Sequence, residues 1–258
     1  SGGRDCKAWV VMVPLMGAGI LSFVFGSVGK LKAPNGLPYY VFSFAGMVVW
    51  TAFSQVLTRS SSSLLSNSAL VGKVFFPRML LPLSVLLSTL VDVAIAFVLL
   101  MGLVLGYGVH PGLALLLFPV WLVGALGLAL GIGMVTGALM VKYRDISYIV
   151  PVAVQFLLFA SPVAYSAASV PARARWLFDL NPLTGLLEGM RWSLINTARP
   201  TTGMAIYSLA FAAIVLLLGA AVVGRPMLPL VQSPISILTR CIILAPQFLE
   251  EIAVVELI

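Results

Sequence analysis

Long apolar runs separated by isolated charges are the feature of this chain that most limits its fold. The runs cover about residues 8–26, 39–57, 80–106, 113–140, 147–165 and 203–223. Each is close to the roughly 20 apolar residues that an α-helix needs to cross a bilayer. A helix also satisfies every backbone polar group inside lipid. The pattern therefore predicts an all-α integral membrane protein with six transmembrane helices.

The composition excludes a soluble globular protein and an enzyme. Hydrophobic residues make up 61% of the 258 residues and charged residues 9%, which leaves too few polar side chains to cover a water-exposed surface. The net charge is +7, but the basic residues stand singly beside apolar runs, which argues against a nucleic-acid partner. No phosphate-binding loop, catalytic constellation or metal-ligand cluster occurs, so we expect no catalytic residue, metal or cofactor in this chain.

The distribution of basic residues predicts the orientation of the chain. Six spans place both termini on one side of the membrane. Lys and Arg are modestly more frequent on that side. Because cytoplasmic loops carry an excess of these residues, both termini are expected in the cytoplasm.

A polar stripe runs along the third apolar segment. Ser84, Ser88 and Asp92 are spaced by four residues and therefore share one side of a helix. Such a stripe must face protein or water. It is either a hydrogen-bonded packing seam or a lining of a translocation path, with Asp92 as a possible proton site.

The fourth apolar segment carries glycines at spacing four, in Gly127-xxx-Gly131 and Gly133-xxx-Gly137. Small residues at this spacing allow helix backbones to approach closely in lipid. The spacing predicts a packing face, within the chain or between subunits.

Three motifs follow one another along the chain, namely Tyr143-Arg144-Asp145, Ser161-Pro162 and Leu180-Asn181-Pro182-Leu183-Thr184-Gly185. Their order resembles that in the permease subunits of ABC exporters that carry lipid-linked polysaccharides out of bacteria. The resemblance implies a homodimer in the bacterial inner membrane, a lipid-linked glycan as cargo, and a separate ABC ATPase that binds ATP and magnesium.

The resemblance also gives a role to the segment between the second and third spans. By composition this segment is a short amphipathic helix that ends at Pro77, and it could be a simple interfacial connector. In the resembling exporters the matching segment is the coupling helix that docks on the ATPase. The implied ATPase-coupling residues are Asn67, Leu70, Lys73, Phe75, Phe76, Pro77 and Arg78.

Arg144 and Asp145 follow the fourth span. Opposite charges at a helix end usually reflect solvation, with Asp145 favoured near the N-terminus of the fifth helix. The resemblance places the pair near the cytoplasmic mouth of the path, where a role in substrate entry is the alternative.

Residues 161–195 are expected to dip into the outer leaflet as short helices. Pro162 breaks the fifth span, while Asn181 can cap a new helix that begins with Pro182. Glu188 and Arg191 are spaced to pair on one helical face. In the resembling exporters this region is the gate at the outer mouth. The implied gate residues are Pro162, Tyr165, Asn181, Pro182, Glu188 and Arg191.

Two departures and three alternatives accompany the resemblance. Residues 1–224 form the expected permease domain, although the interfacial helix that usually precedes the first span is largely missing, and residues 225–258 form a divergent tail. The alternatives are an ABC permease for a lipid or small drug, an ion-coupled carrier using Asp92, and a membrane scaffold that transports nothing.

Overall fold

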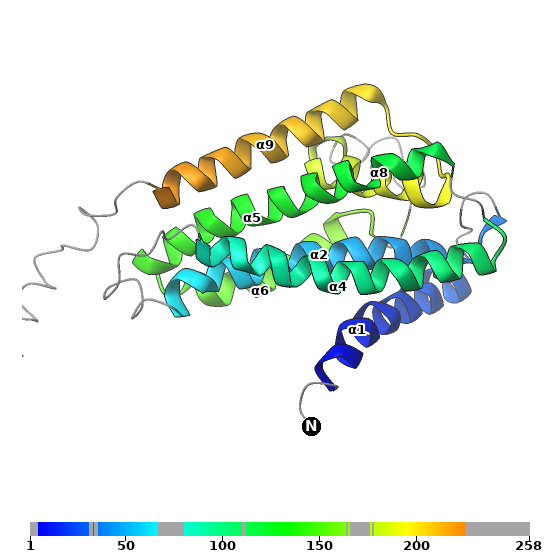
Figure 1. Cartoon of the computed structure of the whole chain (residues 1–258), viewed down its shortest axis with the longest axis horizontal. Helices are drawn as coiled ribbons and strands as arrows, with labels where there is room; N and C mark the ends of the chain where they lie inside the picture. Colours follow the sequence, from blue (N-terminus) through cyan, green and yellow to red (C-terminus); the bar gives the residue numbers. More distant parts are fainter. Residues whose placement is uncertain are drawn as a thin grey trace, which may run out of the picture.

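The protein is a bundle of long helices, and the part of the chain that the structure describes contains no strand (Figure 1). The computed structural model describes residues 5–30, 33, 36–66, 80–109, 112–163, 165, 176 and 178–224. The elements, in chain order, are α1 (Asp5–Leu21), the π-helical turn η1 (Ser22–Val28), α2 (Tyr39–Ser66), α4 (Leu80–Gly106), the 3₁₀ turn η3 (Leu113–Leu117), α5 (Phe118–Lys142), α6 (Ile146–Ala160), α8 (Pro182–Ile195) and α9 (Thr202–Gly224).

Each of the predicted apolar runs coincides at least in large part with a helix, and the fifth run continues beyond the end of its helix at Ala160. Four helices are long and apolar enough to cross a membrane, which makes this a multi-pass membrane protein; they cover Tyr39–Ser63, Pro82–Gly106, Leu113–Lys142 and Thr202–Val223. The first and fifth runs correspond to shorter apolar helices, Met12–Val28 and Ile146–Ala160. The all-helical membrane fold is confirmed, and the count of six spans stays a prediction.

The central helix of the bundle is α2, which packs against α1, α4 and α5. In the most apolar stretch of α2, 78% of the residues are buried inside the protein, compared with 22% in the corresponding stretches of α4 and α9. The same helix has the lowest mean hydropathy of the four. This inverse relation is expected in lipid, because polar side chains are tolerated where protein covers them, whereas outer helices must be apolar.

The end of α2 was predicted wrongly at residue 57, since the helix continues to Ser66. The predicted second span leaves the run of serines at residues 60–63 in the connection to the third span. Ser60, Ser61 and Ser63 are instead buried, and each hydroxyl donates to the carbonyl three residues earlier. A serine that returns its hydroxyl to its own helix needs no water, so the helix continues.

Glycines allow α5 to pack closely on two sides. Gly131 contacts the backbone of α9 near Val215, while Gly133 contacts α2 at Leu57 and Ser60. The predicted packing role of this glycine face is confirmed, and it operates within the chain.

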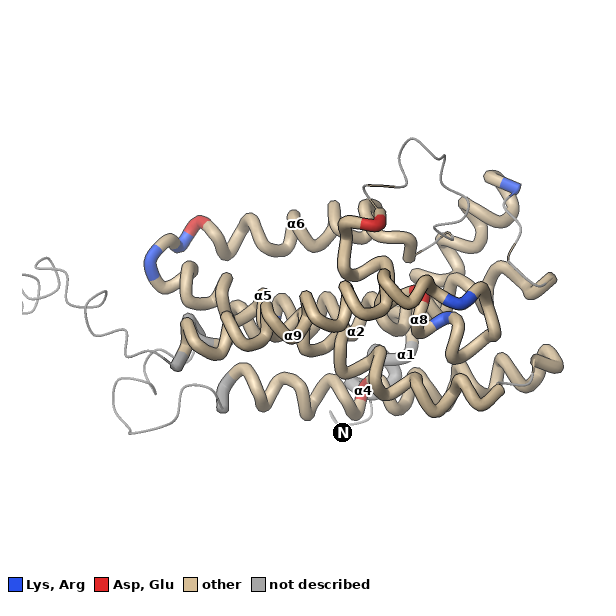
Figure 2. Tube along the Cα trace, turned by 90° about the horizontal axis from the view of Figure 1, so that it is seen from above, with Lys and Arg blue, Asp and Glu red and all other residues tan. Residues whose placement is uncertain are grey.

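Most of the charged residues that are coloured in Figure 2 lie toward the ends of the long helices. One end holds the short connection from Lys142 to Ile146, between α5 and α6. The opposite end holds the turn after α6, together with α8 and the start of α9 (Figure 1).

Candidate functional site

The site is built around a break in the chain after α6. The helix ends at Ala160, before the end of the apolar run at residue 165 but at the break predicted for Pro162, because Pro162 lacks the N–H that a helix would need. We call Ser161, Pro162, Val163 and Tyr165 the α6–α8 turn. The Tyr165 hydroxyl folds back and donates to the Phe159 carbonyl at 3.1 Å, which satisfies one acceptor left free by the helix end.

The start of α8 has the predicted chemistry. Asn181 is the N-cap, its side-chain oxygen accepting from the Leu183 N–H at 3.0 Å, and Pro182 occupies the first turn. The same side chain donates to the Ser161 hydroxyl at 3.1 Å. The cap of α8 is therefore tied directly to the α6–α8 turn.

Arg191 joins α8 to the same turn. Its side chain is only 2% exposed. One terminal nitrogen donates to the carbonyls of Pro162, at 2.7 Å, and Tyr165, at 3.1 Å, and the other donates to the carbonyl of Val163. Three backbone acceptors therefore surround the guanidinium group, in addition to its electrostatic interaction with Glu188.

The electrostatics of Arg191 follow from this burial. Arginine keeps its charge in proteins, and the carboxylate of Glu188 stabilises that charge electrostatically. Charge-assisted hydrogen bonds of this kind are stronger than those between neutral groups.

Two residues of α2, Phe42 and Gly46, complete the surroundings of the guanidinium group. The group lies over the ring of Phe42, at 4.2 Å from the ring centroid. A Cβ at Gly46 would collide with both Arg191 Nη2 and the Val163 carbonyl. Neither α2 residue was predicted to belong to the site, because their role depends on a distant side chain.

The remainder of α8 is packed protein and not a solvated loop. Leu183, Leu187 and Leu194 are all buried. Gly185 lies against Ser208 of α9, and Gly189 lies against the Trp121 ring of α5. The predicted helix after Pro182 is confirmed, whereas its action as a gate is not tested by this packing.

Arg144 and Asp145 lie at the other end of the bundle. Both are exposed, and Asp145 is the residue that immediately precedes α6, as predicted. Its side chain makes no capping hydrogen bond, so any stabilisation of the helix comes from its charge alone.

The polar stripe of α4 lies mostly on the surface of the chain. Ser84 and Ser88 are exposed and Asp92 is partly buried. The Ser88 hydroxyl donates to the Val85 carbonyl of its own helix, at 2.9 Å. Because the serines are exposed, the stripe is better explained as a surface that contacts lipid, water or another chain than as a packing contact between helices of this chain.

The predicted coupling residues cannot be placed, because residues 67–79 lie outside the described part of the chain. The continuation of α2 to Ser66 brings this central helix directly to the first of them, Asn67.

An exposed face of α6 was missed in the sequence. Tyr148 and Phe156 are 80% and 71% exposed, and Val152 and Phe159 are also exposed. These positions follow spacings of four, four and three and therefore lie on one side of the helix. That spacing was visible in the sequence, but only the packing shows which side of α6 is uncovered.

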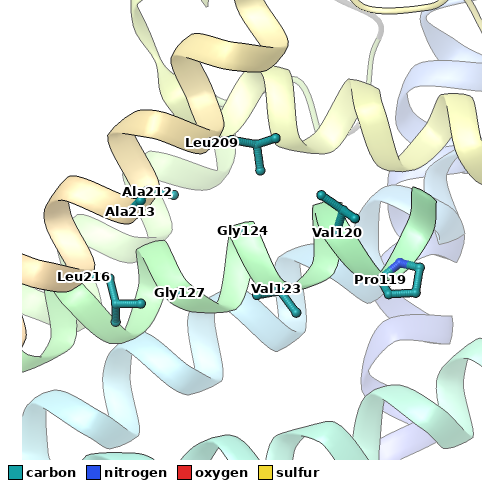
Figure 3. A pocket seen from close by; sticks show the side chains of 9 residues that line it. All are labelled: Pro119, Val120, Val123, Gly124, Gly127, Leu209, Ala212, Ala213 and Leu216. Atoms are coloured by element: carbon teal, nitrogen blue, oxygen red, sulfur yellow. The ribbon is translucent and has the colours of Figure 1, made fainter. Parts of the chain in front are cut away.

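A hollow lies between α5 and α9. It measures about 420 Å³ and is lined by aliphatic side chains and glycines, including Val120, Gly127 and Leu216 (Figure 3). It lies on helices other than α6. Within the described residues no group of His, Cys, Asp or Glu is arranged to hold a metal ion.

Comparisons with known proteins agree with this description. The sequence pattern of the family described as ABC-2 type transporter matches residues 4–195. The O-antigen export system permease protein RfbA of Klebsiella pneumoniae is 25% identical over 189 residues, which are 73% of this chain and 72% of that protein. The protein of the same name from Myxococcus xanthus is 28% identical over 215 residues, which are 82% of this chain and 81% of that protein.

Proposed function

The chain belongs to the ABC-2 type transporter family, and we propose that it is the permease of an exporter that moves lipid-linked polysaccharide across the bacterial inner membrane. The observation that carries the proposal is the agreement between this family and two similar proteins that are both named O-antigen export permeases. Permeases of this family work with an ABC ATPase, so nucleotide and magnesium binding are assigned to that partner.

The shortness of α6, the helix of the fifth predicted span, supports a translocation path beside it. The 15 residues of α6 extend about 22 Å, which is less than the roughly 30 Å of hydrocarbon in a bilayer. Irregular backbone at membrane depth is tolerated only where protein buries it or where it lines a water-filled cavity. Arg191 covers the turn on one side. We assign the path to the other side, along the exposed face that holds Tyr148 and Phe156.

A second copy of the chain is proposed to close this path. Sugars stack on aromatic rings, and an exposed aromatic stripe within a membrane suits a glycan better than it suits an ion. In this arrangement Arg144 and Asp145 lie at the cytoplasmic mouth, and residues 161–195 form the outer gate. Both termini are placed in the cytoplasm, as the basic residues indicate.

Two alternatives remain distinct in their chemistry. An ABC permease for a lipid or small drug would use the same fold and partner with a different cargo. An ion-coupled carrier would instead depend on Asp92, which is the one acid within α4.

A complementation experiment tests the proposal. The chain and its cognate ATPase are expressed together in a bacterium that makes a lipid-linked O-antigen but lacks its own export permease. Surface glycan is measured with the ATPase, without it, and with an ATPase variant that cannot hydrolyse ATP. We expect surface glycan only with the active ATPase. Export by the permease alone would favour a carrier, while extrusion of dyes without glycan would favour a drug or lipid exporter.

A further inference from the structure

We infer that Arg191 is a latch that keeps the outer gate closed by fastening the α6–α8 turn to α2 at Phe42 and Gly46. This inference rests on the proposed function, in which residues 161–195 are the gate. The gate assignment already includes Arg191; the inference adds a role for its side chain and a mechanical connection from the gate to α2.

The first argument is the chemistry of the broken backbone. Backbone carbonyls in an irregular turn at membrane depth need a donor, because no water is present to take that role. Arg191 is the donor for three of them, in Pro162, Val163 and Tyr165. Movement of α8 away from the turn would leave the three carbonyls and the guanidinium cation without partners at the same time. All three hydrogen bonds are therefore expected to form or break together.

The second argument is the close fit of α2. Only a residue without a Cβ can lie at position 46, because a Cβ there would collide with the guanidinium and the Val163 carbonyl. Phe42, one helical turn earlier, presents its ring to the cation. The latch is thus a joint of three elements, namely the turn, α8 and α2.

The third argument is the reach of α2. The helix has 28 residues and is about 42 Å long, with its far end next to the predicted coupling segment. Most of the helix is buried and packed on several neighbours. A shift or tilt imposed at that end by the ATPase would move Phe42 and Gly46 relative to α8. The two ends of the transporter are then linked by one rigid element with two arrangements at the latch.

The latch is not fully satisfied when closed. Within the described part of the chain, the buried Arg191 Nε has no hydrogen-bond partner. Releasing Arg191 therefore costs less free energy than it would if all five guanidinium donors were hydrogen-bonded. This suits a contact that must open in each transport cycle.

The test measures the opening of the gate at one buried position. A cysteine replaces Leu187, which is 1% exposed, in a chain whose Cys6 and Cys241 are changed to serine. Labelling by a membrane-impermeant thiol reagent is followed in the complex with the ATPase, with and without ATP. A cysteine at Leu128, a buried α5 position, reports general loosening.

Arg191→Gln and Gly46→Ala are compared with Arg59→Gln and Gly102→Ala. Arg59 is exposed, and a Cβ at Gly102 would meet nothing within 4 Å. We expect wild-type labelling at position 187 to require ATP. Both latch variants should label at least about tenfold faster without ATP, since loss of one charge-assisted bond suffices for such a shift. Position 128 and both controls should remain unchanged.

The inference is overturned if both latch variants stay protected without ATP, or if positions 187 and 128 become reactive together. Should Arg191→Gln fail to insert, Gly46→Ala decides the question, because it keeps Arg191 and all of its hydrogen-bond acceptors. Glycan export by the wild type is measured separately. Normal export with no change in labelling refutes the latch alone, whereas absent wild-type export refutes the proposed function.

Discussion

The contact between α5 and α9 gives a prediction that can be worked out from distances. A Cβ at Gly131 would lie 2.6 Å from the Val215 carbonyl oxygen and 2.7 Å from the Leu216 nitrogen, both backbone atoms. Ordinary contacts begin at 3.4 Å, so Gly131→Ala requires α9 to retreat by about 0.8 Å. At Gly127, one turn earlier, the nearest atom is the flexible end of Leu216 at 3.6 Å, and Ala fits without movement.

These distances predict opposite effects of the same substitution. Replacing glycine by alanine in a helix stabilises it by about 0.5–1 kcal/mol, which is the expected result for Gly127→Ala. Overpacking against backbone costs about 1–3 kcal/mol, which outweighs that gain for Gly131→Ala. The two variants should therefore differ by roughly 2 kcal/mol, or about thirtyfold in the unfolding equilibrium.

Reversible unfolding by SDS in mixed micelles measures this difference. The fluorescence of the five tryptophans follows the transition, and the wild type is titrated beside both variants. A Gly131→Ala protein as stable as Gly127→Ala would refute the argument, since the backbones could not then be in contact at this crossing.

Further predictions concern the site and the coupling segment. Asn181→Ala should lower stability by about 1 kcal/mol through loss of the α8 cap, visible in the same SDS titration, and an unchanged midpoint would contradict the cap. Asp92→Asn should keep glycan export while Asp92→Leu reduces it, because Asn preserves polar partners; equal loss in both, with normal insertion, would indicate a proton site. Replacing Phe75 and Phe76 by Ala, or Arg78 by Glu, should leave ATP hydrolysis but abolish export, and normal export with normal co-purification of the ATPase would make this segment a connector.

Local chemistry explains why parts of the fold could be predicted. The third apolar run matches α4 because Pro77 and Arg78 precede it and a Gly- and Pro-containing turn follows it. The cap of α8 was found because Asn-Pro acts on its own helix. The end of α2 was missed for the opposite reason. Its serines are polar in the sequence, but burial against Gly133 of α5 and bonds to their own helix remove their need for water.

The partners of Arg191 were beyond the reach of sequence reasoning. Its acceptors are backbone carbonyls 26 to 29 positions away, and they are free only because the chain breaks after α6. A carbonyl has no signature in a sequence, so Glu188, three residues away, was the visible candidate. The role of Gly46 depends in turn on that arginine. Long-range sites of this kind require the packed structure.

The most direct test of the account is transport by purified components. The chain is reconstituted into vesicles with its ATPase and a fluorescent lipid-linked polysaccharide, and movement across the bilayer is followed by quenching from the opposite side. We predict movement only when both proteins and ATP are present, with none for the chain alone under any proton or sodium gradient. Movement driven by an ion gradient without the ATPase would contradict the assignment as an ABC exporter permease.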